Sequence, residues 1–141
     1  MPEATAGYEF FDHTADVGIR AQGATLTELL EQLARGLVEL IAEDSRLEPR
    51  RAKPIQLAAA DAEMLALRWL QEALFWFSTE RFLPAAYALG TGPTSLRGEV
   101  RGDTFDPARH VQGREVKAIT RHLLSVEQRD GRWHGQVIVD I

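Results

Sequence analysis

The sequence contains no cysteine among its 141 residues. A chain without cysteine has no disulfide framework, no thiolate ligand for zinc or an iron–sulfur cluster, and no thiol nucleophile. The rest of the composition, 45% hydrophobic and 26% charged, is typical of a globular domain and excludes a disordered or fibrous chain. A chain of this length fits one domain, so we expect residues 1–141 to form a single domain, with residues 1–7 flexible.

Basic residues are outnumbered by acidic ones, and lysine is rare. Lysine and arginine together number 16 against 21 aspartates and glutamates, which gives a net charge of −5 at pH 7. Neutralising nucleic-acid phosphates needs a basic surface, so we expect no strong direct binding to nucleic acid. The only lysines are Lys53 and Lys117. Such a bias is usually genomic, but a retained lysine can also mark a place where a compact point charge is needed. Lys53, in an expected polar loop, shows the limit of that inference.

Long apolar segments are absent as well. The segment from Met1 to Gly7 is polar and lacks the basic and apolar regions of a secretory signal. The longest apolar stretch, around residues 69–77, is interrupted by Gln71 and Glu72 and falls far short of the roughly 20 apolar residues of a membrane span. We therefore expect a cytoplasmic protein that does not enter a membrane. Neither a glycine-rich phosphate loop nor a G-x-S-x-G elbow is present, so nothing indicates a self-contained nucleotide enzyme.

Two segments have the period of amphipathic helices. Thr25 and Glu28 form a capping box, and leucines follow at three- and four-residue spacing to about Ala42. Asp61 is placed to cap a second helix that runs to about Thr79.

The remaining apolar residues follow the two-residue period of β-strands. The expected strands are residues 8–11, 17–21, 54–60, 85–89, 95–101, 115–125 and 133–139, with loops at 43–53 and 103–113. Together these elements predict an α+β fold in which two helices pack on an antiparallel or mixed β-sheet. A loose repeat in the order of elements also suggests two interleaved strand–helix–strand–strand units.

The densest polar cluster lies between the first two expected strands. Asp12, His13 and Asp16 bring two carboxylates and an imidazole together within one short segment. Aspartate and threonine in such a segment commonly stabilise a turn by bonding to the backbone. The alternative is an oxygen-rich cation site or an acid–base pair. A zinc site is not expected, because no two of the four histidines have the i, i+4 helical spacing of zinc enzymes.

A second cluster lies at the end of the last expected strand. Asp140 precedes Ile141, so its side chain lies beside a terminal carboxylate, and the two anions repel each other unless something positive is near. A frayed, solvated terminus is the common arrangement. However, Val137, Ile138, Val139 and Ile141 favour a strand up to the last residue, which indicates a docked terminus. A docked pair of carboxylates would suit a hard cation such as Ca²⁺, Mg²⁺ or Mn²⁺.

Two weaker candidates complete the set. Glu115 and Lys117 share one face of an expected strand, which is typical of a solvated surface; alternatively, Lys117 is presented beside the carboxylates described above. Arg109 and His110 lie in an expected loop, where they are either surface residues or face a ligand.

Taken together, these residues resemble the archease family. The segment from Tyr8 to Gly18 is similar to its N-terminal signature, and Glu115 to Thr120 and Val137 to Ile141 are similar to its two C-terminal signatures. The resemblance spans about residues 8–141. One departure is Arg121, where the family commonly has tyrosine.

The resemblance implies an accessory activator rather than an enzyme. Archeases assist the tRNA-splicing RNA ligase, which joins 2′,3′-cyclic phosphate and 5′-hydroxyl RNA ends, uses GTP and Mn²⁺, and passes through a guanylylated histidine. They promote guanylylation and multiple turnover, and they broaden nucleotide use. The implied fold has two small units, one inserted in the other, and we expect a monomer or a weak homo-oligomer.

Carried over residue by residue, the family's functional cluster is Asp16, Lys117 and Asp140. The resemblance further implies a divalent cation, seen as Ca²⁺ in the family, on Asp16, Asp140 and the carboxylate of Ile141. Asp12 and His13 are additional candidates for this site.

Two other functions stay open on the sequence alone. One is a general chaperone or modulator of RNA-modifying enzymes such as a tRNA methyltransferase. The other is a stand-alone metal-dependent hydrolase that uses Asp12, His13 and Asp16.

Overall fold

The structure, a computed structural model, describes residues 5–13, 16–44 and 46–141. Four strands form a first sheet, sheet A, in the order β1-β2-β7-β6, and every neighbouring pair in it is antiparallel. These strands are β1 (Gly7–His13), β2 (Asp16–Gly23), β6 (Ala118–Arg129) and β7 (Arg132–Asp140). Sheet A therefore joins the first strands of the chain to the last. Of the segment expected to be flexible, residues 1–4 lie outside the described residues, and Gly7 is the first residue of β1.

A second, three-stranded sheet, sheet B, has the antiparallel order β3-β5-β4. Its strands are β3 (Arg51–Ala58), β4 (Phe82–Gly92) and β5 (Ser95–Thr104). All of sheet B, together with helix α2 (Ala62–Glu80), is inserted between helix α1 (Leu26–Ile41) and β6. The predicted α+β fold with two interleaved units is confirmed, with antiparallel pairing throughout.

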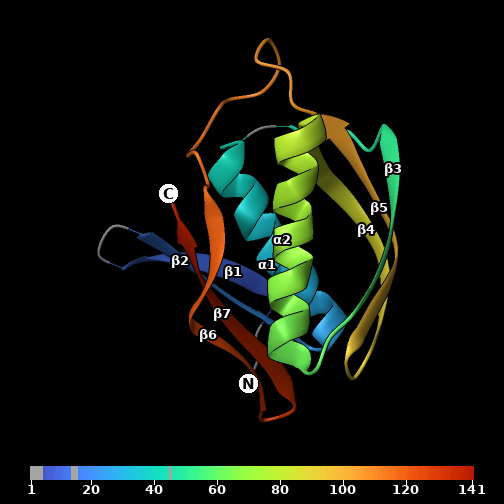
Figure 1. The fold of residues 1–141 in the computed structure, drawn as a ribbon, viewed down its shortest axis with the longest axis vertical. Coiled ribbons are helices and arrows are strands. Elements are labelled where there is room, and N and C mark those ends of the chain that lie inside the picture. The colour runs from blue at the N-terminus through green and yellow to red at the C-terminus, as the bar shows by residue number, and fades with distance from the viewer. Residues whose placement is uncertain (1–4, 14–15, 45) are drawn as a thin grey trace.

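The two helices lie between the two sheets (Figure 1), and each helix contacts strands of both. Trp69 of α2 is fully buried, and its indole N–H donates a hydrogen bond of 2.8 Å to the carbonyl of Leu30 in α1. A buried indole needs such a partner, so this bond fixes the depth at which α2 packs on α1. None of the described helices is long and apolar enough to span a membrane.

Both helices begin where the capping residues predict. The Thr25 hydroxyl accepts a hydrogen bond from the Glu28 N–H at 3.1 Å, and an Asp61 carboxylate oxygen accepts from the Met64 N–H at 2.8 Å. Each bond satisfies one of the free N–H groups of a first helical turn. The evenly spaced leucines of α1 face the core, and the fully buried ones are Leu29, Leu30, Leu33 and Leu37.

The expected loop at residues 43–53 is wrong at its end, because β3 begins at Arg51. Lys53 is therefore a strand residue, and its ammonium pairs with Glu80 at the end of α2. The charged residues and Pro49 make this segment look like a loop, so the strand is expected only from Pro54 onward. Proline is tolerated because β3 is an edge strand of sheet B, where a missing N–H leaves no ladder bond unmade.

The strand expected from residue 115 begins three residues later, at Ala118. Glu115 and Lys117 thus precede β6 and do not share a strand face. Beyond its start, β6 is irregular: its register against β7 shifts between Thr120 and Ser125, and Leu123 has a left-handed backbone with φ 54°.

Candidate functional site

The ends of β2 and β7 bring two of the predicted site residues together. Asp16, the first residue of β2, and Asp140, the last of β7, are directly opposite in the antiparallel register. Their neighbours Val17 and Val139 are buried on the helix side, so both aspartates are on the outer face of sheet A. Opposite residues have Cβ atoms roughly 5 Å apart, and like charges at that separation destabilise a sheet. This pair therefore favours a positively charged ligand.

Lys117 is tied to the same strand end through its backbone. Its N–H donates a hydrogen bond of 2.8 Å to the carbonyl of Asp140, just before β6 begins. Its side chain is exposed, and among the described residues neither Asp16, Lys117 nor Asp140 takes part in an ion pair. The charges at this end of sheet A are thus available to a partner.

The other candidates of the first polar cluster separate in the fold. His13 occupies the register position opposite Asp16, but Asp12 is opposite Val17 and so belongs to the other face of the sheet. Thr14 and Ala15 lie outside the described residues. The strand register thus groups Asp16 with Asp140 and not with Asp12.

Ile141 is half-buried and packs against the hydrophobic core. The apolar end of the chain is docked, as its composition predicts, and this holds the end of β7 in place. Among residues 5–13, 16–44 and 46–141, no three histidine, aspartate or glutamate side chains form a group that would hold a metal ion.

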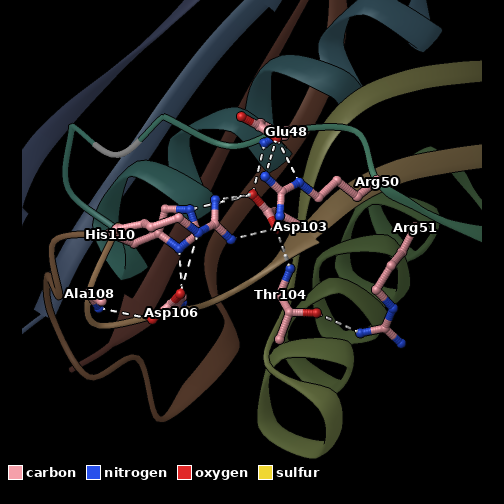
Figure 2. Close-up of polar contacts among 9 residues, drawn as sticks. Glu48, Arg50, Arg51, Asp103, Thr104, Asp106, Ala108 and His110 are labelled. Atoms are coloured by element: carbon pink, nitrogen blue, oxygen red, sulfur yellow. Dashed lines mark hydrogen bonds and ion pairs between the residues drawn. The ribbon is translucent and has the colours of Figure 1, made fainter.

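A second polar network surrounds Asp103 near the end of β5 (Figure 2). Its carboxylate is only 2% exposed and receives two hydrogen bonds from the guanidinium of Arg109, at 3.2 and 3.1 Å. The N–H groups of Glu48 and Thr104 donate to the same carboxylate at 3.0 and 2.9 Å. Burial by itself raises the pKa of Asp103, but these donors outweigh it and lower the pKa to about 2.

His110 is part of this network rather than a free imidazole. Its side chain is 0% exposed, and its Nδ1 accepts a hydrogen bond of 2.9 Å from the Asp106 N–H. Its Nε2 lies 3.5 Å from Asp103 Oδ2. Arg109 is similarly occupied, because its Nε also pairs with Asp106 at 3.3 Å. Of the two alternatives for this segment, a surface position holds for Arg109 but not for His110, which is buried; both residues hold the segment after β5 in shape.

Sequence reasoning missed Asp103 entirely. The residue follows Arg101 and Gly102 in what looks like the start of a polar loop, and nothing local shows that it is buried. Its partner Arg109 is only six residues away, but its other partner Glu48 comes from a segment 55 residues earlier. The nearest signal is the spacing of Asp103, Asp106 and Arg109 at three-residue steps, which by itself is compatible with any exposed loop.

The chain matches known proteins over almost its whole length. The Archease protein family matches residues 8–141. A protein archease of Pyrobaculum islandicum is 37% identical over 139 residues, covering 95% of each chain. A protein archease of Pyrococcus furiosus is 35% identical over 139 residues, covering 95% of this chain and 98% of its own.

Two solved structures share the fold. The solution structure of Methanobacterium thermoautotrophicum protein 1598 has a TM-score of 0.83 and 31% identity, covering 96% of this chain and 99% of that one. The crystal structure of an archease from Thermotoga maritima has a TM-score of 0.65 and 21% identity, covering 100% of this chain and 98% of that one.

Proposed function

Since this chain belongs to the archease family, we propose that it is a cytoplasmic accessory protein that activates a GTP-dependent tRNA-splicing RNA ligase. In this proposal the protein promotes guanylylation of the ligase and its multiple turnover, broadens its use of nucleotides, and carries out no self-contained catalysis. The observation that carries the proposal is the pairing of Asp16 with Asp140 at one end of sheet A.

Two unpaired carboxylates on adjacent strands are a local cost to folding, so their presence needs a compensating role. They project from the outer face of sheet A, beside a lysine whose backbone is fixed to the same strand end. Such a cluster is suited to contact a metal or a nucleotide phosphate held in another protein. It would act on the ligase without binding RNA directly, which agrees with the net charge of −5.

The donor set also fits a hard divalent cation. We propose that Asp16, Asp140 and the terminal carboxylate of Ile141 hold Ca²⁺, with Mg²⁺ or Mn²⁺ as alternatives. All three groups offer carboxylate oxygens, which are the ligands that these ions prefer. When bound, the cation would neutralise the two facing aspartates. Lys117, whose N–H is bonded to the Asp140 carbonyl, would balance the remaining negative charge.

The proposal is tested by measuring guanylylation of the RNA ligase from the same organism, with and without this protein. We expect the full chain to accelerate GTP-dependent labelling of the ligase and to allow more than one ligation per ligase molecule. A ligase whose labelling and turnover are unchanged at a molar excess of the protein would contradict the proposal. Stable binding to unrelated RNA-modifying enzymes, without that acceleration, would instead favour a general chaperone.

Adding one glycine after Ile141 tests the terminal ligand. The extension moves the terminal carboxylate by about 3.5 Å, while the side chain of Ile141 can stay in its core position. We expect affinity for Ca²⁺, measured by isothermal titration calorimetry, to fall by about tenfold or more. Asp130→Asn, at the far end of the β6–β7 hairpin, is the control and should bind as the unmodified chain does. Unchanged affinity in the extended chain would remove Ile141 from the ligand set.

A further inference from the structure

A pocket of about 630 Å³ lies where the C-terminal ends of α1 and α2 meet the segment between β5 and β6. Its apolar lining includes Phe77, Phe105 and Val116, and Arg81 and Arg114 also line it. Figure 1 shows both helix ends and this segment at the same end of the molecule. Val116 is followed directly by Lys117, so the pocket adjoins the cluster at the end of sheet A.

The pocket is held in shape by hydrogen bonds on each side. The Gly113 and Arg114 N–H groups donate to the carbonyls of Ile41 and Leu40 at the end of α1, at 2.9 and 2.6 Å. The Phe105 N–H donates to the carbonyl of Arg81 at 2.8 Å, just after α2. A cavity with a fixed lining loses little entropy when it binds a ligand.

Its aromatic lining is supported by the network around Asp103. The ring of Phe105 meets that of Phe77 edge-on at 6.0 Å between centroids and lies 5.7 Å from the imidazole of His110. His110 is fully buried beside Asp103, so it supports the side of the Phe105 ring that faces away from the pocket. The Phe105 ring is therefore a rigid part of the apolar lining.

Arg81 is at a position where arginine is costly. It ends α2 with a left-handed backbone, φ 57°, a position that glycine usually occupies. Its guanidinium lies over the Phe77 ring, 5.0 Å from the centroid. Neither Arg81 nor Arg114 takes part in an ion pair among the described residues, although the chain as a whole is acidic.

We propose that this pocket docks an acidic segment of the partner protein, which places an apolar side chain against Phe77 and Phe105 and a carboxylate between Arg81 and Arg114. The inference rests on the proposed function, because the partner is the RNA ligase. Charge complementarity selects the occupant: two unpaired guanidiniums attract a carboxylate, and the aromatic lining accepts a side chain.

A polyanion such as RNA is a poorer occupant. The pocket combines two arginines with Glu115 and apolar side chains, which suits one carboxylate beside one apolar group better than a row of phosphates. Nucleic acid would require a broader basic surface than two arginines. The pocket therefore provides affinity for the ligase, while the adjoining Asp16 and Asp140 act on its chemistry.

The test compares binding with stimulation for the full-length chain. Arg81→Gly, Arg114→Gln and the double variant are titrated against the RNA ligase, with Arg97→Gln of β5 as a control that removes one unpaired exposed charge on sheet B. We expect the double variant to weaken binding by about tenfold or more, each single variant by less, and the control not at all. Excess double variant should restore full stimulation of guanylylation.

The stability of Arg81→Gly shows whether a loss of ligase binding comes from a lost contact or from a damaged fold. Glycine suits the left-handed position, so the melting temperature of this variant should be unchanged or higher while its affinity for the ligase falls. Lower affinity together with a lower melting temperature of the same variant would point to a structural role and overturn the proposal.

The remaining outcomes are distinct. If the unmodified chain binds and stimulates the ligase but the arginine variants bind equally well, the docking proposal fails and the proposed function stands. If the unmodified chain neither binds nor stimulates, the proposed function fails and the docking proposal falls with it. If the free chain binds a fluorescent single-stranded RNA and the double variant does not, the occupant is nucleic acid and the proposal is wrong.

Discussion

Replacing Asp140 with asparagine is expected to reduce stimulation of ligase guanylylation by about tenfold or more, and Asp16→Asn should do the same. Asparagine keeps the size of the side chain and removes only the charge that faces the opposite strand. Because the two aspartates repel each other across β2 and β7, each variant should be as stable as the unmodified chain, or more stable by up to about 1 kcal/mol. Initial rates of guanylylation and urea unfolding measure the two effects on the same preparations.

The combination of lost stimulation and retained stability is what identifies a functional pair. Asp130→Asn is the matched control, since it removes one carboxylate roughly 25 Å away along β7, at about 3.3 Å per residue. Asparagine also suits the left-handed backbone of that position, φ 53°. Full stimulation by both Asp16→Asn and Asp140→Asn would show that the pair has no part in activation. These variants should still bind the ligase normally, unlike those of Arg81 and Arg114.

Asp103→Asn is expected to destabilise the protein by about 2–4 kcal/mol at pH 7. The substitution leaves the guanidinium of Arg109 without its buried counter-charge and turns one acceptor oxygen into an N–H₂ donor facing other donors. For a domain of this size the melting temperature should fall by about 5–15 °C. Calorimetry checks this shift. Asp106→Asn, which changes a 45% exposed partner of the same arginine, should lower the melting temperature much less.

The same carboxylate makes stability sensitive to acid. The pKa of Asp103 is lowered from 3.8 to about 2 in the folded chain, so the folded state favours the ionised form. Its contribution is fully present above pH 4 and is lost as the pH falls from about 4 to about 2, amounting to about 2 kcal/mol. The free energy of unfolding, measured across that pH range, should fall more steeply for the unmodified chain than for Asp103→Asn. Parallel curves would mean that Asp103 is not the group responsible.

Much of the fold was predictable because its signals are local. Thr25 and Asp61 bond to N–H groups three residues away, and the leucines of α1 repeat with the helical period, so neighbouring residues suffice to locate both helices. The start of β3 was not predictable from neighbours. The expected strand begins only at Pro54, and the charged residues before it are ordered by a distant partner, since Arg51 and Lys53 both pair with Glu80 of α2.

The candidate site, like the fold, could be predicted from the sequence only in part. The sequence pattern puts Asp16 in one polar segment and Asp140 in another, only the resemblance to the archease family joins them, and the strand register places them opposite each other. Either Asp12 or Asp16 could have shared a face with Asp140. The choice depends on how β1 and β2 pair, and the spacing of residues in the sequence does not determine that pairing. The pocket between the helix ends, and the contact that Glu48 makes with the buried Asp103, depend on segments far apart in the sequence, and no local pattern encodes them.

The insertion of one unit into the other also has a consequence for protein synthesis. The ribosome releases β1 and β2 first, but β7, the second partner of β2, emerges only after the whole of sheet B and β6. Until then β2 has an unpaired edge, and Asp16 has no counterpart. Pairing so distant along the chain is slow to form, so a nascent chain is exposed to aggregation through this edge. The facing carboxylates come together only once β7 has been translated, so a chain that ends before β7 lacks the pair.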